Sequence, residues 1–231
     1  MQTTTETRAA QEGRITARPQ RVTEPAPIGL QRLGLGAPRD GVFAAPPGYD
    51  PNHPAPLVLT LHGAGGDGRS GISPFLPLIG QMGAILVAPD ARGTTWDILR
   101  GGYGPDVAFI NRALELIFSR YAVDPDRLAI EGFSDGASYA LSLGITNGAF
   151  FKHIIAFSPG FVEPAAHQDE PAIFISHGTH DHVLPIDQTS RRIVRHLKRL
   201  GYLVRYEEFD GGHSVPPSIA QEAARWFLPA S

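Results

Sequence analysis

A serine flanked by two glycines is the feature of this 231-residue chain that bears most directly on chemistry. It stands in Gly132-Phe133-Ser134-Asp135-Gly136, directly after the apolar run 128–130. The pattern predicts a strand, a sharp turn that carries Ser134, and a helix from about Ala137. Glycine suits both flanks of the turn, because a Cβ there would collide with neighbouring backbone. Such a turn presents the serine hydroxyl as a nucleophile.

A serine hydroxyl is a poor nucleophile at neutral pH unless an imidazole takes its proton and a carboxylate orients that imidazole. In an open α/β sheet, these partners should follow later strands. Asp181 stands in a turn after the apolar run 172–175, and His213 stands on a glycine-flanked loop after the run 203–206. Ser134, Asp181 and His213 follow the chain order of the α/β-hydrolase triad. Asp187 lies close by and is either the alternative acid or a helix cap.

Two backbone N–H groups are expected to bind the negative oxygen that forms during acyl transfer. One is the amide of Asp135, the residue after the nucleophile, whose side chain would be incidental. The other is the amide of Ala64, in the glycine-rich loop 62–66 after the first long strand. Each such donor contributes roughly 3 kcal/mol to stabilisation of the transition state.

Alternating strand and helix patterns must position these groups. Runs that are apolar on both faces indicate strands covered on both sides, as in a parallel sheet. The six runs are 57–61, 84–88, 128–130, 154–157, 172–175 and 203–206, of which the last is more polar and nearer an edge. Helical stripes are predicted over 107–121, 137–143, 193–200 and 216–227, the first ending before a turn at Asp124-Pro125-Asp126. The segment 14–43 is expected to add one or two antiparallel edge strands, so that the whole forms a doubly wound, mostly parallel α/β sheet.

Composition excludes several classes of function. The net charge of −3 gives no indication of nucleic acid or an anionic membrane as a partner. The absence of cysteine excludes disulfides and cysteine-bound zinc. Residues 1–27 are polar and lack the apolar core of a signal peptide, which predicts a loosely ordered N-terminal segment before a single domain over 28–231. The location expected from this pattern is cytoplasmic.

Several motifs, taken together, resemble the phospholipase/carboxylesterase and polyhydroxybutyrate-depolymerase-like esterases of the α/β-hydrolase superfamily. They are Leu61-His62-Gly63, Ala88-Pro89-Asp90, Asp124-Pro125-Asp126-Arg127, 132–136, 178–185 and Gly212-His213. The resemblance implies the α/β-hydrolase fold, a triad of Ser134, Asp181 and His213, and Ala64 and Asp135 as oxyanion donors. It also implies that no cofactor or metal is needed. Many such esterases have Gln or Ala where this chain has Asp135, a difference that leaves the backbone role intact.

Other residues have two interpretations. Trp96 and Tyr103 are candidate substrate-binding residues, although Trp96 is equally suited to the core. Three histidines beside Asp181, at positions 177, 180 and 182, suggest a metal cluster, but their spacing matches no familiar zinc pattern, and the prediction is no metal. His62 is expected to support its own loop through side-chain hydrogen bonds.

We expect a serine hydrolase that cleaves small-molecule carboxylic esters through an acyl-enzyme. Only about a dozen residues separate Phe157 from Pro171, which leaves no room for a large lid and predicts an open site for short or soluble esters or for polymer ends. A peptidase of the prolyl-oligopeptidase kind shares the triad order, but those enzymes carry a large extra domain, which this length lacks. A non-catalytic binding module that kept the fold is the second alternative. The oligomeric state is not indicated by the sequence.

Overall fold

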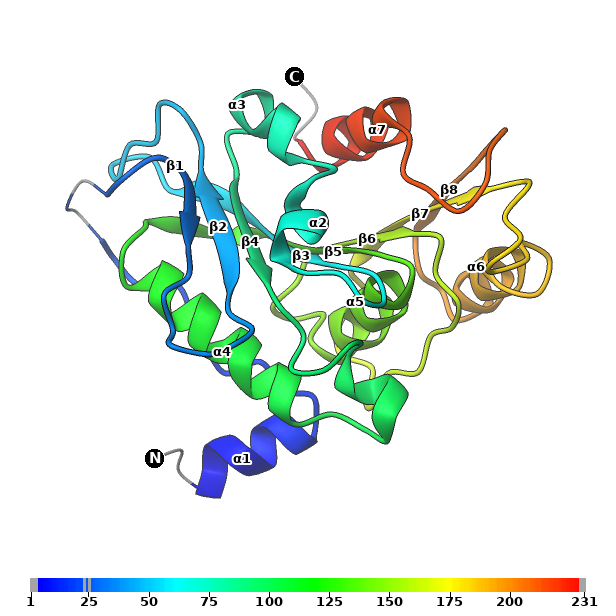
Figure 1. Cartoon of the computed structure of the whole chain (residues 1–231), viewed down its shortest axis with the longest axis horizontal. Helices are drawn as coiled ribbons and strands as arrows, with labels where there is room; N and C mark the ends of the chain where they lie inside the picture. Colours follow the sequence, from blue (N-terminus) through cyan, green and yellow to red (C-terminus); the bar gives the residue numbers. More distant parts are fainter. Residues whose placement is uncertain (1–3, 23, 25, 229–231) are drawn as a thin grey trace.

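An eight-stranded sheet runs through the molecule in the order β1-β2-β4-β3-β5-β6-β7-β8 (Figure 1). This is a computed structural model, which describes residues 4–22, 24 and 26–228. The strands are β1 (Gly29–Arg32), β2 (Gly41–Ala45), β3 (Ala55–Leu61), β4 (Ile85–Pro89), β5 (Val123–Phe133), β6 (His153–Phe157), β7 (Ala172–Gly178) and β8 (Val204–Phe209). From β4 to β8 along the sheet the neighbours are parallel, whereas β1 and β2 are antiparallel additions at one edge. The predicted mostly parallel α/β sheet with antiparallel edge strands is confirmed.

The burial of each strand explains why an apolar run in the sequence predicted that strand. Every residue of β3 and β4 is buried, as expected for central strands covered on both faces. In β8, no residue is buried: Arg205 and Glu208 are exposed and the other four residues are half-buried. That pattern agrees with the position of β8 at the second edge of the sheet.

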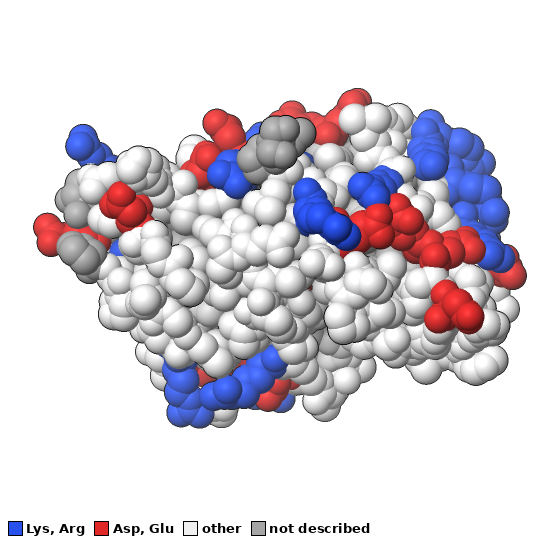
Figure 2. Space-filling view, turned by 90° about the horizontal axis from the view of Figure 1, so that it is seen from above, with Lys and Arg blue, Asp and Glu red and all other residues white. Residues whose placement is uncertain are grey.

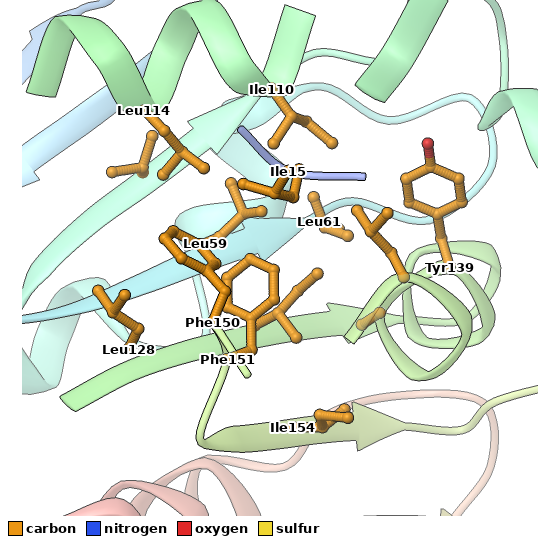
Figure 3. Close-up of a cluster of buried hydrophobic side chains, with 14 of the residues drawn as sticks. Ile15, Leu59, Leu61, Ile110, Leu114, Leu128, Tyr139, Phe150, Phe151 and Ile154 are labelled. Carbon is orange, nitrogen blue, oxygen red and sulfur yellow. The ribbon is translucent and has the colours of Figure 1, made fainter. Parts of the chain in front are cut away.

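Helices cover both faces of the sheet. They are α1 (Thr4–Gln11), α2 (Gly68–Ile72), α3 (Ile79–Met82), α4 (Pro105–Phe118), α5 (Asp135–Thr146), α6 (Ser190–Arg199) and α7 (Pro217–Phe227), with 3-10 turns at Leu76–Leu78 and Asp97–Arg100. The core on one face joins α4, α5 and α6 to the sheet, and the core on the other face joins α2, α3 and α7. In Figure 3, Ile110 and Leu114 of α4 point toward Leu59 and Leu61 of β3. No helix among the described residues is long and apolar enough to cross a membrane.

The N-terminal segment is packed over the range that the structure describes, which differs from the loose order predicted for it. Ile15 is buried beside α4 and β3 (Figure 3). Asn111 of α4 accepts hydrogen bonds from the amides of Thr16 and Ala17, and Asn147 accepts one from the amide of Ile15 at 2.8 Å. These asparagines lie about a hundred residues along the chain, so the polar composition of the segment did not reveal them.

The predicted turn at Asp124-Pro125-Asp126 lies inside β5 as an irregularity of the strand. Ala55 of β3 pairs with Val123 and Leu57 pairs with Leu128, so the register shifts between the two pairs. The amide of Asp126 donates to the carboxylate of Asp124 at 3.0 Å, a local turn stabilised by an aspartate side chain. Regular pairing then resumes and leads to Ser134.

Candidate active site

Ser134 sits in a strained turn between β5 and α5. Its φ is 57° and its ψ is −120°, a conformation that costs free energy for a residue with a side chain. Its amide donates to the carbonyl of Phe157 at 2.9 Å, which ties the turn to β6. A Cβ on Gly132 would collide with the carbonyl of Gly136, and a Cβ on Gly136 would collide with that of Leu61. The predicted need for glycine on both sides is confirmed.

Two short contacts connect Ser134, His213 and Asp181. The Nε2 atom of His213 lies 2.8 Å from the Ser134 hydroxyl, and its Nδ1 atom lies 2.6 Å from a carboxylate oxygen of Asp181. Because a carboxylate only accepts, Nδ1 carries the proton and Nε2 accepts from the serine hydroxyl. The ring of Phe133 packs against the imidazole with centroids 4.7 Å apart. The structure thus brings together three residues that lie on three separate loops.

The carboxylate of Asp181 is buried and fully hydrogen-bonded. Its second oxygen accepts from the amides of Val183 and Leu184 at 2.9 and 2.8 Å. Burial raises the pKa of this carboxyl, but the Leu184 amide and His213 outweigh burial, and the pKa is lowered overall. Asp181 is therefore ionised at neutral pH and holds the His213 tautomer.

His177 is a supporting residue that sequence reasoning considered only as a metal ligand. Its Nε2 lies 2.8 Å from the carbonyl of Leu184 and 3.1 Å from the Asp181 carboxylate, while its Nδ1 lies 2.6 Å from the hydroxyl of Ser190. Burial lowers the pKa of His177, which keeps the ring neutral. It therefore anchors the loop that carries Asp181 to the start of α6.

Asp187, the alternative acid, does not approach His213. Its carboxylate is exposed and pairs with Arg191 on α6 at 2.9 Å. The geometry favours Asp181 as the acid and leaves Asp187 on the surface.

The loop expected to supply the Ala64 amide lies beside the nucleophile. A Cβ on Gly63 would lie 3.3 Å from the Cβ of Ser134. Neither the Ala64 amide nor the Asp135 amide donates a hydrogen bond to another of the described residues, so a ligand that bound them would displace no partner there. Asp135 begins α5, whose N-terminal dipole favours negative charge.

Side chains hold this loop from behind. The ring of His62 contacts the carbonyl of Gly63 at 2.7 Å and accepts from the amide of Ala91 at 2.9 Å, which confirms its predicted loop-supporting role. The hydroxyl of Thr95 donates to the carboxylate of Asp135 at 2.6 Å. That carboxylate, expected to be incidental, therefore fastens the 92–97 connection to the nucleophile turn.

The structure places Trp96 and Tyr103 in packing positions. Trp96 is completely buried and stacks on Tyr139 with centroids 5.0 Å apart, which favours the core over the substrate pocket, the two alternatives that the sequence left open. Tyr103 packs against Gly13 and Tyr139, and its hydroxyl is buried. Bulky aromatic residues on glycine-rich loops suit a pocket or a core equally, and the distant packing partners decide the outcome.

The histidines beside Asp181 diverge. His177 points to Ser190, and the exposed His180 pairs with Asp210 at 3.0 Å. Within residues 4–22, 24 and 26–228, no three His, Cys, Asp or Glu side chains converge as metal ligands.

A largely apolar cavity of about 490 Å³ opens beside His213. Its walls come from α2 and the segment after it, from the end of β5, and from the 213–220 stretch that leads into α7. They include Pro74, Pro77, Leu78, Phe133 and Val215. A cavity of this size accommodates a small organic group next to the reacting atoms.

The connection from β6 to β7 contains no helix and lies along α5. Three hydroxyls, spaced four residues apart on α5, accept hydrogen bonds from backbone amides of this connection at 2.9–3.0 Å. Ser138 accepts from Gly160, Ser142 from Glu163 and Thr146 from Ala165. Residues 158–171 thus form a strap along α5 instead of a lid.

A family model and several known esterases match this chain in sequence. A family model described as Phospholipase/Carboxylesterase matches residues 109–228. Feruloyl esterase C of Emericella nidulans is 31% identical over 157 residues, which are 64% of this chain and 57% of that protein. The poly(3-hydroxybutyrate) depolymerase of Ralstonia pickettii is 29% identical over 113 residues, 41% of this chain and 23% of that protein. The chain thus spans less than two thirds of the length of these relatives.

The crystal structure of esterase PE8 has a similar fold. It matches with a TM-score of 0.61 and 26% identity over 75% of this chain and 94% of that one. The family match contains Ser134, Asp181 and His213, whereas Ala64 lies before it.

Proposed function

The chain belongs to the phospholipase/carboxylesterase family, and we propose that it hydrolyses carboxylic esters through an acyl-enzyme on Ser134. The observation that carries this proposal is the line of contacts from the Ser134 hydroxyl to His213 at 2.8 Å and on to Asp181 at 2.6 Å. A nucleophile, a base and an orienting acid within hydrogen-bond distance are what acyl transfer to serine requires.

In the first half of the reaction, the Ser134 oxygen attacks the ester carbonyl and His213 takes its proton at Nε2. Asp181 stabilises the resulting imidazolium through Nδ1–H. The amides of Ala64 and Asp135 donate to the oxyanion of the tetrahedral intermediate, and each donor is worth roughly 3 kcal/mol. The intermediate collapses as His213 protonates the leaving alcohol, and the acyl group remains on Ser134.

In the second half, a water molecule attacks the acyl-enzyme. His213 takes a proton from that water, and the same two amides stabilise the second oxyanion. Return of the proton to the Ser134 oxygen releases the carboxylic acid. No step calls for a metal or a cofactor.

The cavity beside His213 supports an ester with an apolar group next to the scissile bond. Its proline, leucine and phenylalanine walls suit a flat or branched hydrocarbon group. The name of the Emericella nidulans relative indicates feruloyl esters, and an ester of an aromatic acid is therefore a substrate candidate for this chain as well.

The strap over residues 158–171 supports the open site expected from the sequence. Because this connection contains no helical lid, short or soluble esters and exposed polymer ends can reach the nucleophile past it. We therefore expect activity that decreases with acyl chain length and that shows no activation at a lipid interface.

A single domain over 28–231 and a cytoplasmic location stay predictions from the sequence.

A panel of p-nitrophenyl esters of increasing chain length, methyl ferulate and a matched anilide tests the proposal. The wild type and Ser119→Ala, which removes an exposed hydroxyl at the end of α4, should hydrolyse short esters at equal rates. Ser134→Ala should lose turnover by a factor of about 10⁴ or more, since it removes the hydroxyl that contacts His213. Full activity of Ser134→Ala would disprove the mechanism, and faster turnover of the anilide than of the esters would indicate a peptidase.

A further inference from the structure

A groove of about 730 Å³ runs along α6, and none of the residues that line it belongs to the triad. Arg192, Arg195, Lys198 and Arg199 line it, and Ile193 and Val162 supply apolar surface between them. Val162 belongs to the strap over residues 158–171, so the groove lies between the strap and the helix. Figure 2 shows Lys and Arg side chains gathered at the right-hand end of the molecule, where Figure 1 shows α6.

The positive charges of this groove are uncompensated. None of the four cations makes an ion pair, a side-chain hydrogen bond or a ring contact with another residue of the described ranges. Arg191 on the same helix, by contrast, binds both Asp187 and Glu208. Like charges three and four residues apart destabilise a helix, and the chain as a whole carries a net charge of −3. Such a local excess of cations fits a bound anionic partner.

The spacing of the cations favours an extended anion over a single ion. Arg192, Arg195 and Arg199 follow one stripe of α6 and span about 10 Å along its axis. Guanidinium groups bind carboxylates through two parallel hydrogen bonds, a geometry that lysine cannot match. The amide of Gln188 at the groove adds a donor and an acceptor for neutral polar groups.

Both walls of the groove lead back to the proposed active site. The strap leaves β6 next to Ser134, whose amide binds the Phe157 carbonyl, and reaches Val162 five residues later. The opposite wall starts at Asp181 and reaches Gln188 seven residues later. Leu184 of that wall lies against Gly160 of the strap. A molecule held on α6 therefore lies beside the two segments that lead to Ser134 and to Asp181.

We propose that this groove binds a carboxylate-bearing polysaccharide, the polymer to which the hydrolysed ester is attached. That the hydrolysed ester and the bound carboxylates belong to the same polymer rests on the proposed function. Esters form on hydroxyl groups, and an acidic polysaccharide carries hydroxyls on every sugar unit together with carboxylates at regular spacing. The residues that line the groove include no Phe, Tyr or Trp, and His196 supplies the single ring among them, whereas proteins that bind single-stranded nucleic acid stack successive bases on several rings. Its concave form suits a chain better than the flat surface of a bilayer.

Binding of fluorescently labelled polygalacturonate to the Ser134→Ala enzyme tests the proposal without turnover. The triple variant Arg192→Gln, Arg195→Gln, Arg199→Gln should bind it at least tenfold more weakly. A control triple variant, Arg32→Gln, Arg120→Gln, Arg225→Gln, removes the same charge from exposed positions elsewhere and should bind normally. Neutral dextran should not bind to any of the proteins.

Equal loss of affinity in both triple variants would overturn the proposal, because net charge alone would then explain the binding. Tighter binding of single-stranded DNA, or of phosphatidylglycerol vesicles, through the same arginines would also overturn it. Hydrolysis of a short neutral ester by the groove variant in an otherwise wild-type chain should be unchanged. Failure of the wild type to hydrolyse any ester would refute the proposed function while leaving the polygalacturonate result to be judged by itself.

Discussion

The indole N–H of Trp96 donates to the main-chain carbonyl of His62, with 2.8 Å between nitrogen and oxygen. A second bond, from the amide of Gly65 to the carbonyl of Thr94 at 2.7 Å, joins the same two loops. The connection after β4 therefore holds the loop that carries the Ala64 amide. Trp96 acts on the site from behind, through the backbone that it positions.

Trp96→Phe should lower both stability and turnover. Loss of the N–H leaves the buried His62 carbonyl without a partner, which costs about 1–3 kcal/mol of unfolding free energy. A misplaced oxyanion donor should lower kcat about tenfold, with little change in KM. Ester kinetics and urea unfolding check this. Trp226→Phe, on the opposite core, should affect stability alone, and an unchanged kcat in Trp96→Phe would argue against the positioning role.

Gly136→Ala should prevent correct formation of the nucleophile turn. The added methyl would meet the carbonyls of Leu61 and His62, and overpacking of this kind costs about 1–3 kcal/mol or more. Gly80→Ala in α3 is the matched control, because no atom lies within 4 Å of its added Cβ. The midpoint temperature of thermal unfolding should decrease strongly for Gly136→Ala and should not change for Gly80→Ala. A Gly136→Ala protein with wild-type stability and activity would show that the turn tolerates a side chain.

Asp181→Asn should lower kcat by roughly 10⁴, as loss of the orienting carboxylate does in serine triads. An amide at this position can donate to Nδ1 and so stabilise the wrong tautomer of His213. Asp187→Asn removes an exposed ion pair with Arg191 and should change kcat less than about twofold. The kcat values of the two variants decide which carboxylate is the triad acid, and a larger loss of kcat in Asp187→Asn would assign that role to Asp187.

Glu131 makes stability depend on pH. It is completely buried, neither carboxylate oxygen has a hydrogen-bond partner among the described residues, and burial raises its pKa well above 4.5. The folded state keeps the proton that the unfolded state releases above pH 4.5, so this contribution to stability falls as pH rises, by at most about 1.4 kcal/mol per pH unit. Glu131→Gln removes the dependence, and its stability relative to wild type should increase from pH 4.5 to 7.5.

Urea unfolding at several pH values checks the Glu131 prediction. Burial also raises the pKa of Asp97, and it raises that of Asp106 to about 6, so the wild-type profile contains their contributions too. Both aspartates are present in the two proteins, and the difference between the proteins isolates Glu131. A difference that stays constant with pH would mean that the carboxyl at position 131 is ionised in the folded protein.

The sequence predicted the parts of this molecule that depend on local pattern. Apolar runs identified the six strands from β3 to β8, and the Ser-Asp-His order identified three residues that the structure brings into contact. The N-terminal packing on Asn111 and Asn147 could not be predicted, since its partners lie far along the chain. The burial of Trp96 depended on a stacking contact with Tyr139, and the role of His177 on a loop geometry that spacing does not specify.

The most direct test of the account is the site and rate of labelling by a fluorophosphonate. Its phosphorus should become bonded to the Ser134 oxygen with loss of fluoride, and mass spectrometry of the digested protein should find one adduct, on the peptide that contains residue 134. His213→Ala should react at least about 10³-fold more slowly, because the hydroxyl has lost its base. An adduct on another residue, or equal rates with and without His213, would contradict the proposed chemistry.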